Sequence, residues 1–275
     1  MKLFKQSIIA LLALAIFTTS CKKEETPAPP ADPLSEFVLI TTLDAPNTNY
    51  TAKVYAREAF YVGYNQVIVK LTDKTTGNNI TDATVIFKPL MDMNSGMKHA
   101  CPTEKPMYND VLKAMDGTIT YVMPGGQMGQ WNLGLEIMSA SGDSDMLSTT
   151  IDVMAKDDAQ LFSFISAADS NQSVFVALVN PKQPQIGSND FEVVVYQRKS
   201  MMDWPAIEKL NIEIEPWMPT MNHGSENNVN PTDMQNGHYL GKVDFSMTGY
   251  WQVKMVIKDD KGNIMKDDAY FDIRF

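Results

Sequence analysis

The chain has 275 residues, of which 44% are hydrophobic and 20% are charged. This length exceeds a single small module, and the apolar fraction excludes a globally disordered chain. The 23 basic and 33 acidic residues give a formal charge of −10, which repels phosphate backbones and argues against nucleic-acid binding. Methionine is over-represented, because 19 methionines outnumber 17 leucines although leucine normally leads globular compositions.

The first twenty residues have the layout of a secretory signal peptide. Lys2 and Lys5 precede an apolar run at residues 8–17, and three small residues then lead to Cys21. The run is too short for a bilayer-spanning helix. A cysteine at this position resembles the lipobox of bacterial lipoproteins, with Thr18 where leucine is usual, so we expect cleavage after residue 20 and lipidation of Cys21. The alternative is an ordinary secretory signal with a coincidental cysteine.

Residues 21–34 have the composition of a tether. They contain four prolines and few apolar side chains, so they cannot build a core. Loss of residues 1–20 removes two lysines and no acid, which takes the mature charge from −10 to −12. The Lys-Lys-Glu-Glu run beside Cys21 is similar to signals that send some lipoproteins to the cell surface. We therefore expect a lipid-anchored protein of the bacterial cell envelope, on the outer membrane, facing either the periplasm or the exterior.

Two similar segments follow each other along the chain. Gly117 precedes Trp131 by fourteen residues, and Gly237 precedes Trp251 by the same distance, so the offset is 120 residues. Upstream, each copy has a strand-like run that ends in Pro-x-Met, followed by Met-x-His. These pairs are Pro89 with Met91 and Met97 with His99 in the first copy, and Pro216 with Met218 and Met221 with His223 in the second. Five landmarks in the same order predict a duplication.

Both copies are expected to be β-sandwiches. Apolar residues alternate with polar ones in runs such as Val67 to Leu71 and Trp251 to Ile257, and period two indicates strands with one buried face. We predict an all-β protein of two tandem immunoglobulin-like β-sandwiches, covering residues 35–157 and 158–275. Trp131 and Trp251 are the expected core anchors.

Soft metal ligands gather in one predicted loop of each copy. The second copy places two thioethers and one imidazole, Met218, Met221 and His223, within six residues. Thioether and imidazole together favour Cu(I) over hard ions, so we predict a copper site there and a weaker one at Met97 and His99. The alternative is that these methionines fill the end of each sandwich and that no ion is bound. Cys101 is the only cysteine left after lipidation, and it is a buried apolar residue, an exposed thiol or a soft ligand beside His99.

The second copy also resembles a known family. Its pattern is Pro216-x-Met218-Pro219-x-Met221-x-His223-Gly224, then Gly237-x-Tyr239, then Phe245-x-Met247-x-Gly249-x-Trp251. This pattern resembles the YtkA-like domain, which is related to the FixH proteins implicated in copper delivery during oxidase assembly. The resemblance covers about residues 173–275, and in the first copy it is degraded, since Gly117-x-Ile119 replaces Gly-x-Tyr. It implies a small extracytoplasmic β-sandwich with a role in copper handling.

The predicted function is binding of copper for delivery to an envelope cuproenzyme or oxidase assembly factor, or for buffering in the envelope. Motifs of hydrolases, zinc proteases and phosphate-binding loops are missing from the sequence, so we do not expect an enzyme. The alternative is a metal-free module whose tandem sandwiches display a surface to a protein or glycan partner.

Overall fold

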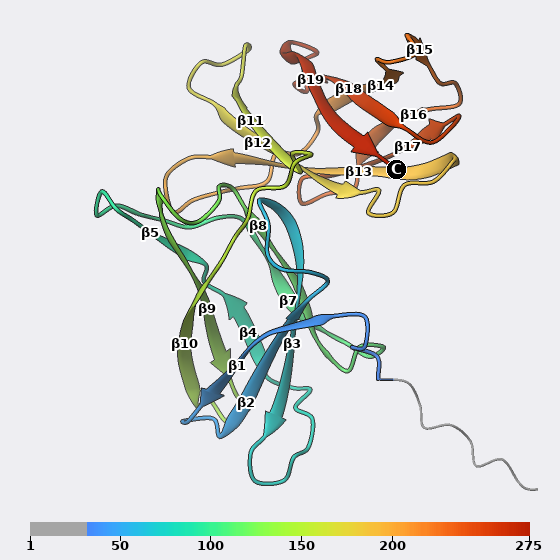
Figure 1. Cartoon of the computed structure of the whole chain (residues 1–275). Coiled ribbons are helices and arrows are strands. Elements are labelled where there is room, and N and C mark those ends of the chain that lie inside the picture. Colours follow the sequence, from blue (N-terminus) through green and yellow to red (C-terminus); the bar gives the residue numbers. More distant parts are fainter. Residues whose placement is uncertain (1–31) are drawn as a thin grey trace, which may run out of the picture. The chain divides into compact units, whose positions relative to one another are not determined.

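The computed structural model describes residues 32–275, and these residues fold into β-strands joined by turns and loops (Figure 1). The expected signal peptide, Cys21 as the expected lipidation site, and nearly all of the expected tether lie outside the described residues. Residues 33–275 form one compact unit. In the described part of the chain, no helix is both long and apolar enough to cross a bilayer.

The first sandwich contains ten antiparallel strands in two sheets. One sheet has the order β1-β2-β3-β8-β7, with bounds Val38–Ala45, Tyr50–Ala56, Gly63–Asp73, Ala114–Tyr121 and Thr103–Asn109. The other has the order β10-β9-β5-β6, with bounds Ser144–Ile151, Gly129–Met138, Leu90–Met93 and Lys98–His99, and β4 (Thr84–Phe87) also pairs with β9.

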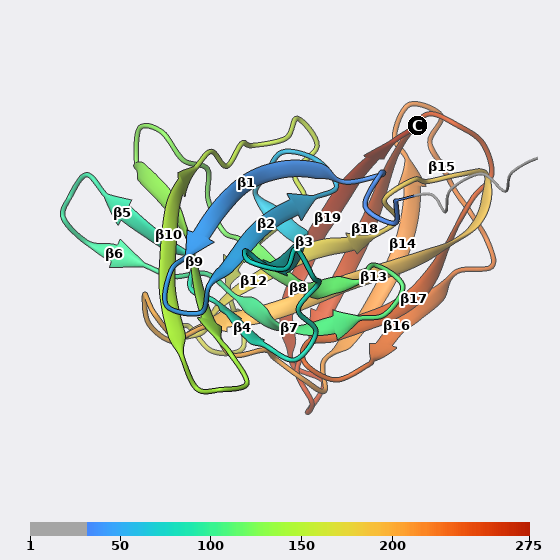
Figure 2. The same ribbon diagram turned by 90° about the horizontal axis from the view of Figure 1, so that it is seen from below.

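The second sandwich contains nine strands. Its first sheet has the order β11-β12-β13-β17-β16, with bounds Leu161–Ile165, Ser173–Asn180, Gly187–Arg198, His238–Phe245 and Val229–Asp233. Its second sheet has the order β15-β14-β18-β19, with bounds His223–Gly224, Asn211–Met218, Tyr250–Lys258 and Ile264–Arg274. Figure 2 shows β14, β18 and β19 side by side. Read in reverse, from β19 to β15, the order of the second sheet corresponds to β10-β9-β5-β6 of the first sandwich. The order of equivalent strands is therefore the same in both sheets of the two copies. The all-β prediction is confirmed.

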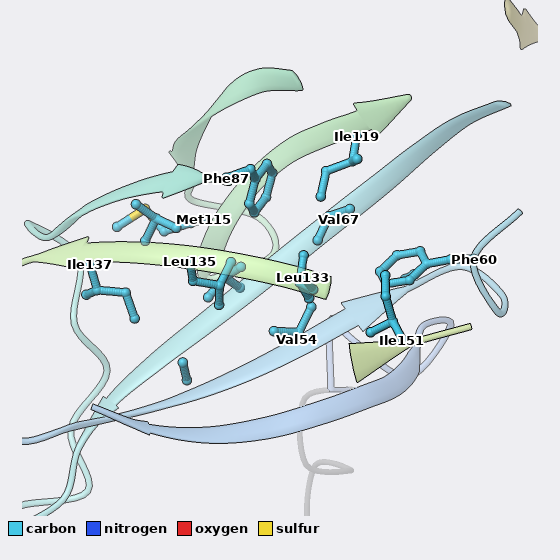
Figure 3. Packing of buried hydrophobic residues seen from close by; sticks show 14 of the residues in the cluster. Val54, Phe60, Val67, Phe87, Met115, Ile119, Leu133, Leu135, Ile137 and Ile151 are labelled. Carbon is cyan, nitrogen blue, oxygen red and sulfur yellow. The ribbon is translucent and has the colours of Figure 1, made fainter. Parts of the chain in front are cut away.

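The core of each sandwich lies between its two sheets. In the first, Figure 3 shows side chains from β2, β3 and β8 meeting side chains from β4, β9 and β10. In the second, every other residue of β18 is buried, from Trp251 to Ile257. Trp131 and Trp251 are fully buried, which confirms their expected role as core anchors.

Two outer faces are buried as well, where alternation alone predicts exposure. Ile68, on the outer face of β3, is covered by Leu34 and Ala114. Leu34, which the sequence analysis assigned to the tether, is therefore part of the folded unit. On β13, Val194 and Tyr196 are buried in a small cluster that also includes Tyr64 of the first sandwich. This cluster is one of the contacts through which the two sandwiches pack.

Candidate metal centre

The two repeat histidines occupy equivalent positions in short strands. His99 lies in β6, opposite Met91 of β5, and His223 lies in β15, opposite Met218 of β14. Directly opposed residues of an antiparallel pair share one face, so each histidine lies on the same face as a buried methionine. The prediction that both histidines lie in loops was wrong, because the chain turns tightly enough to pair them. Pro216 does not end its strand either. β15 pairs only with Trp217 and Met218, and proline is tolerated where one side of a strand is unpaired.

Each imidazole ring is oriented by the same two contacts. Nδ1 of His99 is 3.0 Å from the carbonyl oxygen of Ala100, and Nδ1 of His223 is 2.7 Å from the carbonyl oxygen of Gly224. Each ring stands edge-on to the core tryptophan of its copy, at 5.0 Å from Trp131 and 5.6 Å from Trp251 between ring centroids. A carbonyl oxygen only accepts, so in the neutral ring Nδ1 carries the proton and Nε2 keeps a free lone pair. This second-nitrogen hydrogen bond is typical of metal-ligating histidines.

In each copy, the core tryptophan holds the backbone of a further methionine by a hydrogen bond. The indole Nε1 of Trp131 donates to the carbonyl oxygen of Met123 at 2.9 Å, and that of Trp251 donates to the carbonyl oxygen of Met247 at 3.0 Å. The sequence analysis gave neither Met123 nor Met247 a role as a ligand. Their equivalence is visible only once the tryptophan hydrogen bonds are known, because Met123 precedes its tryptophan by eight residues and Met247 by four.

In the first copy the structure brings His99 together with Met123 instead of Met97. Nε2 of His99 is 3.0 Å from the sulfur of Met123, and His99 is only 4% exposed. Met97 lies in the β5–β6 hairpin and is 50% exposed, with its carbonyl accepting from the N–H of Met93. The first-copy ligand nearest to the imidazole is therefore one that sequence spacing did not identify.

In the second copy the three predicted ligands are distributed between the core and the surface. Met218 is 2% exposed and belongs to the core, whereas Met221 lies in the turn after β14 and is 58% exposed. His223 is half-buried between them. Gly249 leaves room for Met218, because a Cβ there would lie 3.2 Å from the Met218 methyl carbon, and the backbone φ of +135° also favours glycine. Met218 and His223 share a face, and Met221 is close in sequence but exposed.

Other candidate groups are accounted for by packing or by ion pairs. Cys101 is buried in the first core, and burial raises the pKa of its thiol well above the ordinary value, so it is the buried apolar residue among the three alternatives. Within residues 32–275, no three or more histidine, cysteine, aspartate or glutamate side chains are grouped to hold a metal ion. Methionine sulfurs and the two repeat imidazoles remain as candidate ligands.

His238, the third histidine, bridges two carboxylates. Its Nε2 is 2.6 Å from Glu104 of the first sandwich, and its Nδ1 is 2.8 Å from Glu192 of the second. Burial by itself lowers the pKa of His238, but the hydrogen bonds and charges of the two glutamates outweigh burial and raise it from 6.5 to about 9. A doubly hydrogen-bonded, charged ring has no lone pair to offer, so His238 acts as a structural cation.

Comparison with protein families finds one domain. Residues 169–256, about a third of the chain, match the YtkA-like family model. The match begins after β11 and ends within β18, so it contains Met218, Met221, His223, Met247 and Trp251. It confirms the resemblance predicted for the second copy, and it does not extend into the first. The chain therefore contains a YtkA-like domain. A search of curated proteins found no match.

Two solved structures are similar over most of the chain at low identity. The adhesin InvE of Yersinia pseudotuberculosis has 14% sequence identity and a TM-score of 0.27, with 83% of this chain and 60% of that chain covered. InvD of Yersinia pseudotuberculosis has 14% identity and a TM-score of 0.26, with 82% and 57% covered. The chain thus spans less than two thirds of the length of either.

Proposed function

We propose that this protein is a lipid-anchored lipoprotein of the bacterial cell envelope that binds Cu(I) and delivers it to, or buffers it for, an envelope cuproenzyme. One observation carries the proposal. In each copy an imidazole is fixed by a hydrogen bond from Nδ1 to a backbone carbonyl, so that Nε2 of the neutral ring keeps its lone pair, and a methionine is its cross-strand partner.

The chemistry of these ligands supports copper in its reduced state. Thioether sulfur is a soft, neutral donor, and together with imidazole it suits Cu(I) better than hard ions such as calcium or magnesium. A neutral ligand set also binds without displacing protons from thiols or carboxylates, which favours exchange over permanent occupancy. Met221, on the exposed turn, is available for the first contact with an incoming ion. The acidic mature chain adds a general attraction for cations.

The remaining parts of the proposal rest on sequence and on the likeness of the two halves. Lipidation of Cys21 and the tether behind it would hold the sandwiches at the outer membrane. Duplication of one YtkA-like unit is supported by the equal strand orders of the two sandwiches and by the repeated histidine, tryptophan and methionine contacts. Relation of the YtkA-like domain to FixH proteins suggests oxidase assembly as the destination of the metal.

The test is anaerobic competition for Cu(I) between the full-length chain and a chromophoric chelator. We expect the unmodified chain to withdraw copper from the chelator, and the double variant Met221→Leu/His223→Gln to withdraw less. The control is Met234→Leu, since Met234 is equally exposed, at 56%, but lies outside the candidate centre. A chain that leaves the chelator fully loaded would refute copper binding and favour the metal-free module.

A further inference from the structure

We infer that a second soft-metal site lies where the two sandwiches meet, with His99 Nε2 and the sulfurs of Met123 and Met201 as ligands. The inference rests on the proposed Cu(I) function and assigns its ligands in the first copy. Beside His99 is a cavity of about 280 Å³. Met93, His99 and Met123 of the first sandwich line it together with Met201 and Trp204 of the second. Three thioethers and one imidazole thus border a space large enough for an ion.

In the close contact between His99 and Met123, the two facing atoms are both hydrogen-bond acceptors when the ring is neutral. Nδ1 of His99 already faces the carbonyl of Ala100, so the hydrogen of the neutral ring is on Nδ1. Nε2 then presents a lone pair to the sulfur of Met123, which is also an acceptor, at 3.0 Å. Two lone pairs at this distance repel unless something positive lies between them. The arrangement is the one that two ligands of a common ion adopt.

The distance fits that interpretation. Metal bonds of about 2.0 Å to nitrogen and about 2.3 Å to sulfur place the two ligand atoms about 3.0 Å apart at an angle near 90°, and about 3.5 Å apart at a tetrahedral angle. The observed 3.0 Å between Nε2 and Sδ is at the short end of this interval. Widening by about 0.5 Å, which a small side-chain rotation supplies, would give tetrahedral geometry.

Met201 is held at the cavity by its own backbone. Its carbonyl oxygen accepts from the N–H of Ala100 at 2.8 Å and from Nε1 of Trp204 at 3.3 Å. Ala100 directly follows His99, so this bond fixes the backbone of Met201 beside the strand that carries His99, while the Trp131 bond fixes the backbone of Met123. Backbones held in this way leave side-chain rotation as the main adjustment that binding requires. Each sandwich therefore contributes a thioether to one site.

The cavity lining includes Arg198 and no carboxylate. Burial of an uncompensated charge is costly, so bonds from one nitrogen and two sulfurs have to compensate the charge of the ion. Arg198 is exposed, and solvent and salt screen its charge.

The experiment isolates this site by disabling the second-copy loop. The full-length Met221→Leu/His223→Gln chain serves as the background, and Met123→Leu or Met201→Leu is added to it. Leucine conserves the volume of methionine but offers no lone pair. The matched control is Met202→Leu, next in sequence and 60% exposed, but not at the cavity. Unfolding midpoints of all variants show that they fold.

We expect the background chain to retain Cu(I) and its X-ray absorption to give one nitrogen and two or more sulfurs around copper. Met123→Leu and Met201→Leu should each weaken the affinity on the order of tenfold or more and remove one sulfur from the spectrum, whereas Met202→Leu should do neither. A background chain that takes up no copper, or a Met201→Leu chain equal to Met202→Leu, would overturn the inference while leaving the proposed function standing. Failure of the unmodified chain to bind Cu(I) would end both.

Discussion

The ion-pair cluster around His238 gives a quantitative prediction about pH. His238 stands between Glu104 and Glu192, and the side chains are 16%, 30% and 20% exposed. Tyr64 donates its hydroxyl to Glu104 at 3.1 Å, and Asn180 donates its amide to Glu192 at 2.8 Å. The carboxylates therefore have neutral hydrogen-bond donors besides His238. We propose to replace His238 with glutamine, which keeps a hydrogen-bonding side chain but cannot carry the charge.

The magnitude follows from the pKa. A rise from 6.5 in the unfolded chain to about 9 in the folded one corresponds to roughly 3 kcal/mol of stability, and partial solvent exposure reduces this to about 2 kcal/mol. Because the folded pKa is the higher one, the contribution is fully present below about pH 6.5 and is lost as the pH rises through about 9. The pKa of Glu104 is lowered, since bonds from His238 outweigh its burial, so acid below about pH 4.5 also removes the pair.

Urea unfolding of the unmodified chain and of His238→Gln from about pH 6 to about pH 10 measures this contribution. The difference in unfolding free energy should be largest at the acid end and should shrink toward zero at the alkaline end. Burial lowers the pKa of Lys182 to about 8, which acts in the opposite direction, but both chains contain Lys182 and its effect cancels in the difference. His223→Gln, which removes a half-buried histidine without carboxylate partners, is the control. A difference that stays constant with pH would refute the reasoning.

Three further predictions concern the core and the candidate sites. Gly249→Ala should cost about 2–3 kcal/mol because its φ of +135° is nearly confined to glycine and the Met218 methyl is close, whereas Gly77→Ala, at a φ of +71° with nothing within 4 Å, should cost only about 1 kcal/mol; equal losses in chemical denaturation would contradict this. Cys101 should react with a maleimide only after denaturant is added, because its thiol is buried and protonated; rapid labelling of the native chain would show otherwise. Cu(I) at about one hundred times its dissociation constant should raise the unfolding free energy by about 2.7 kcal/mol per site, and calorimetry should show a smaller gain for Met201→Leu.

The sandwiches could be predicted from the sequence because burial of one face imposes period two. Val253 and Met255 point inward and Lys254 outward, as the alternation requires. The rule fails where a second layer covers the outer face. Val194 is buried by packing that involves Tyr64, a residue 130 positions earlier, and Leu34 is buried on Ile68. Contacts between distant residues on outer faces leave no periodic signal in either segment.

The candidate site was only partly accessible from the sequence for a related reason. Spacing of Met and His along the chain identified the two segments that contain the repeat histidines, although it predicted loops where the structure has hairpins. It did not identify Met123, whose carbonyl accepts from Trp131, or Met201, whose carbonyl accepts from Ala100. Ligands supplied by another strand or another sandwich can be found only when the fold that brings them together is known.

The two copies differ both in how completely they keep the family motif and in how their candidate metal ligands are arranged. The sequence predicts the stronger site in the second copy, where two methionines and one histidine lie within six residues, and this copy alone matches the family model. Yet the first copy, where the motif is degraded, has an imidazole nitrogen 3.0 Å from a thioether sulfur. Pro219 lies in the turn between β14 and β15, where Met221 is exposed. In the first copy, the cavity beside His99 is also lined by Met201 of the second sandwich. Loss of the turn residues is therefore compatible with a ligand set that both sandwiches supply, and family likeness alone does not decide which copy binds more tightly.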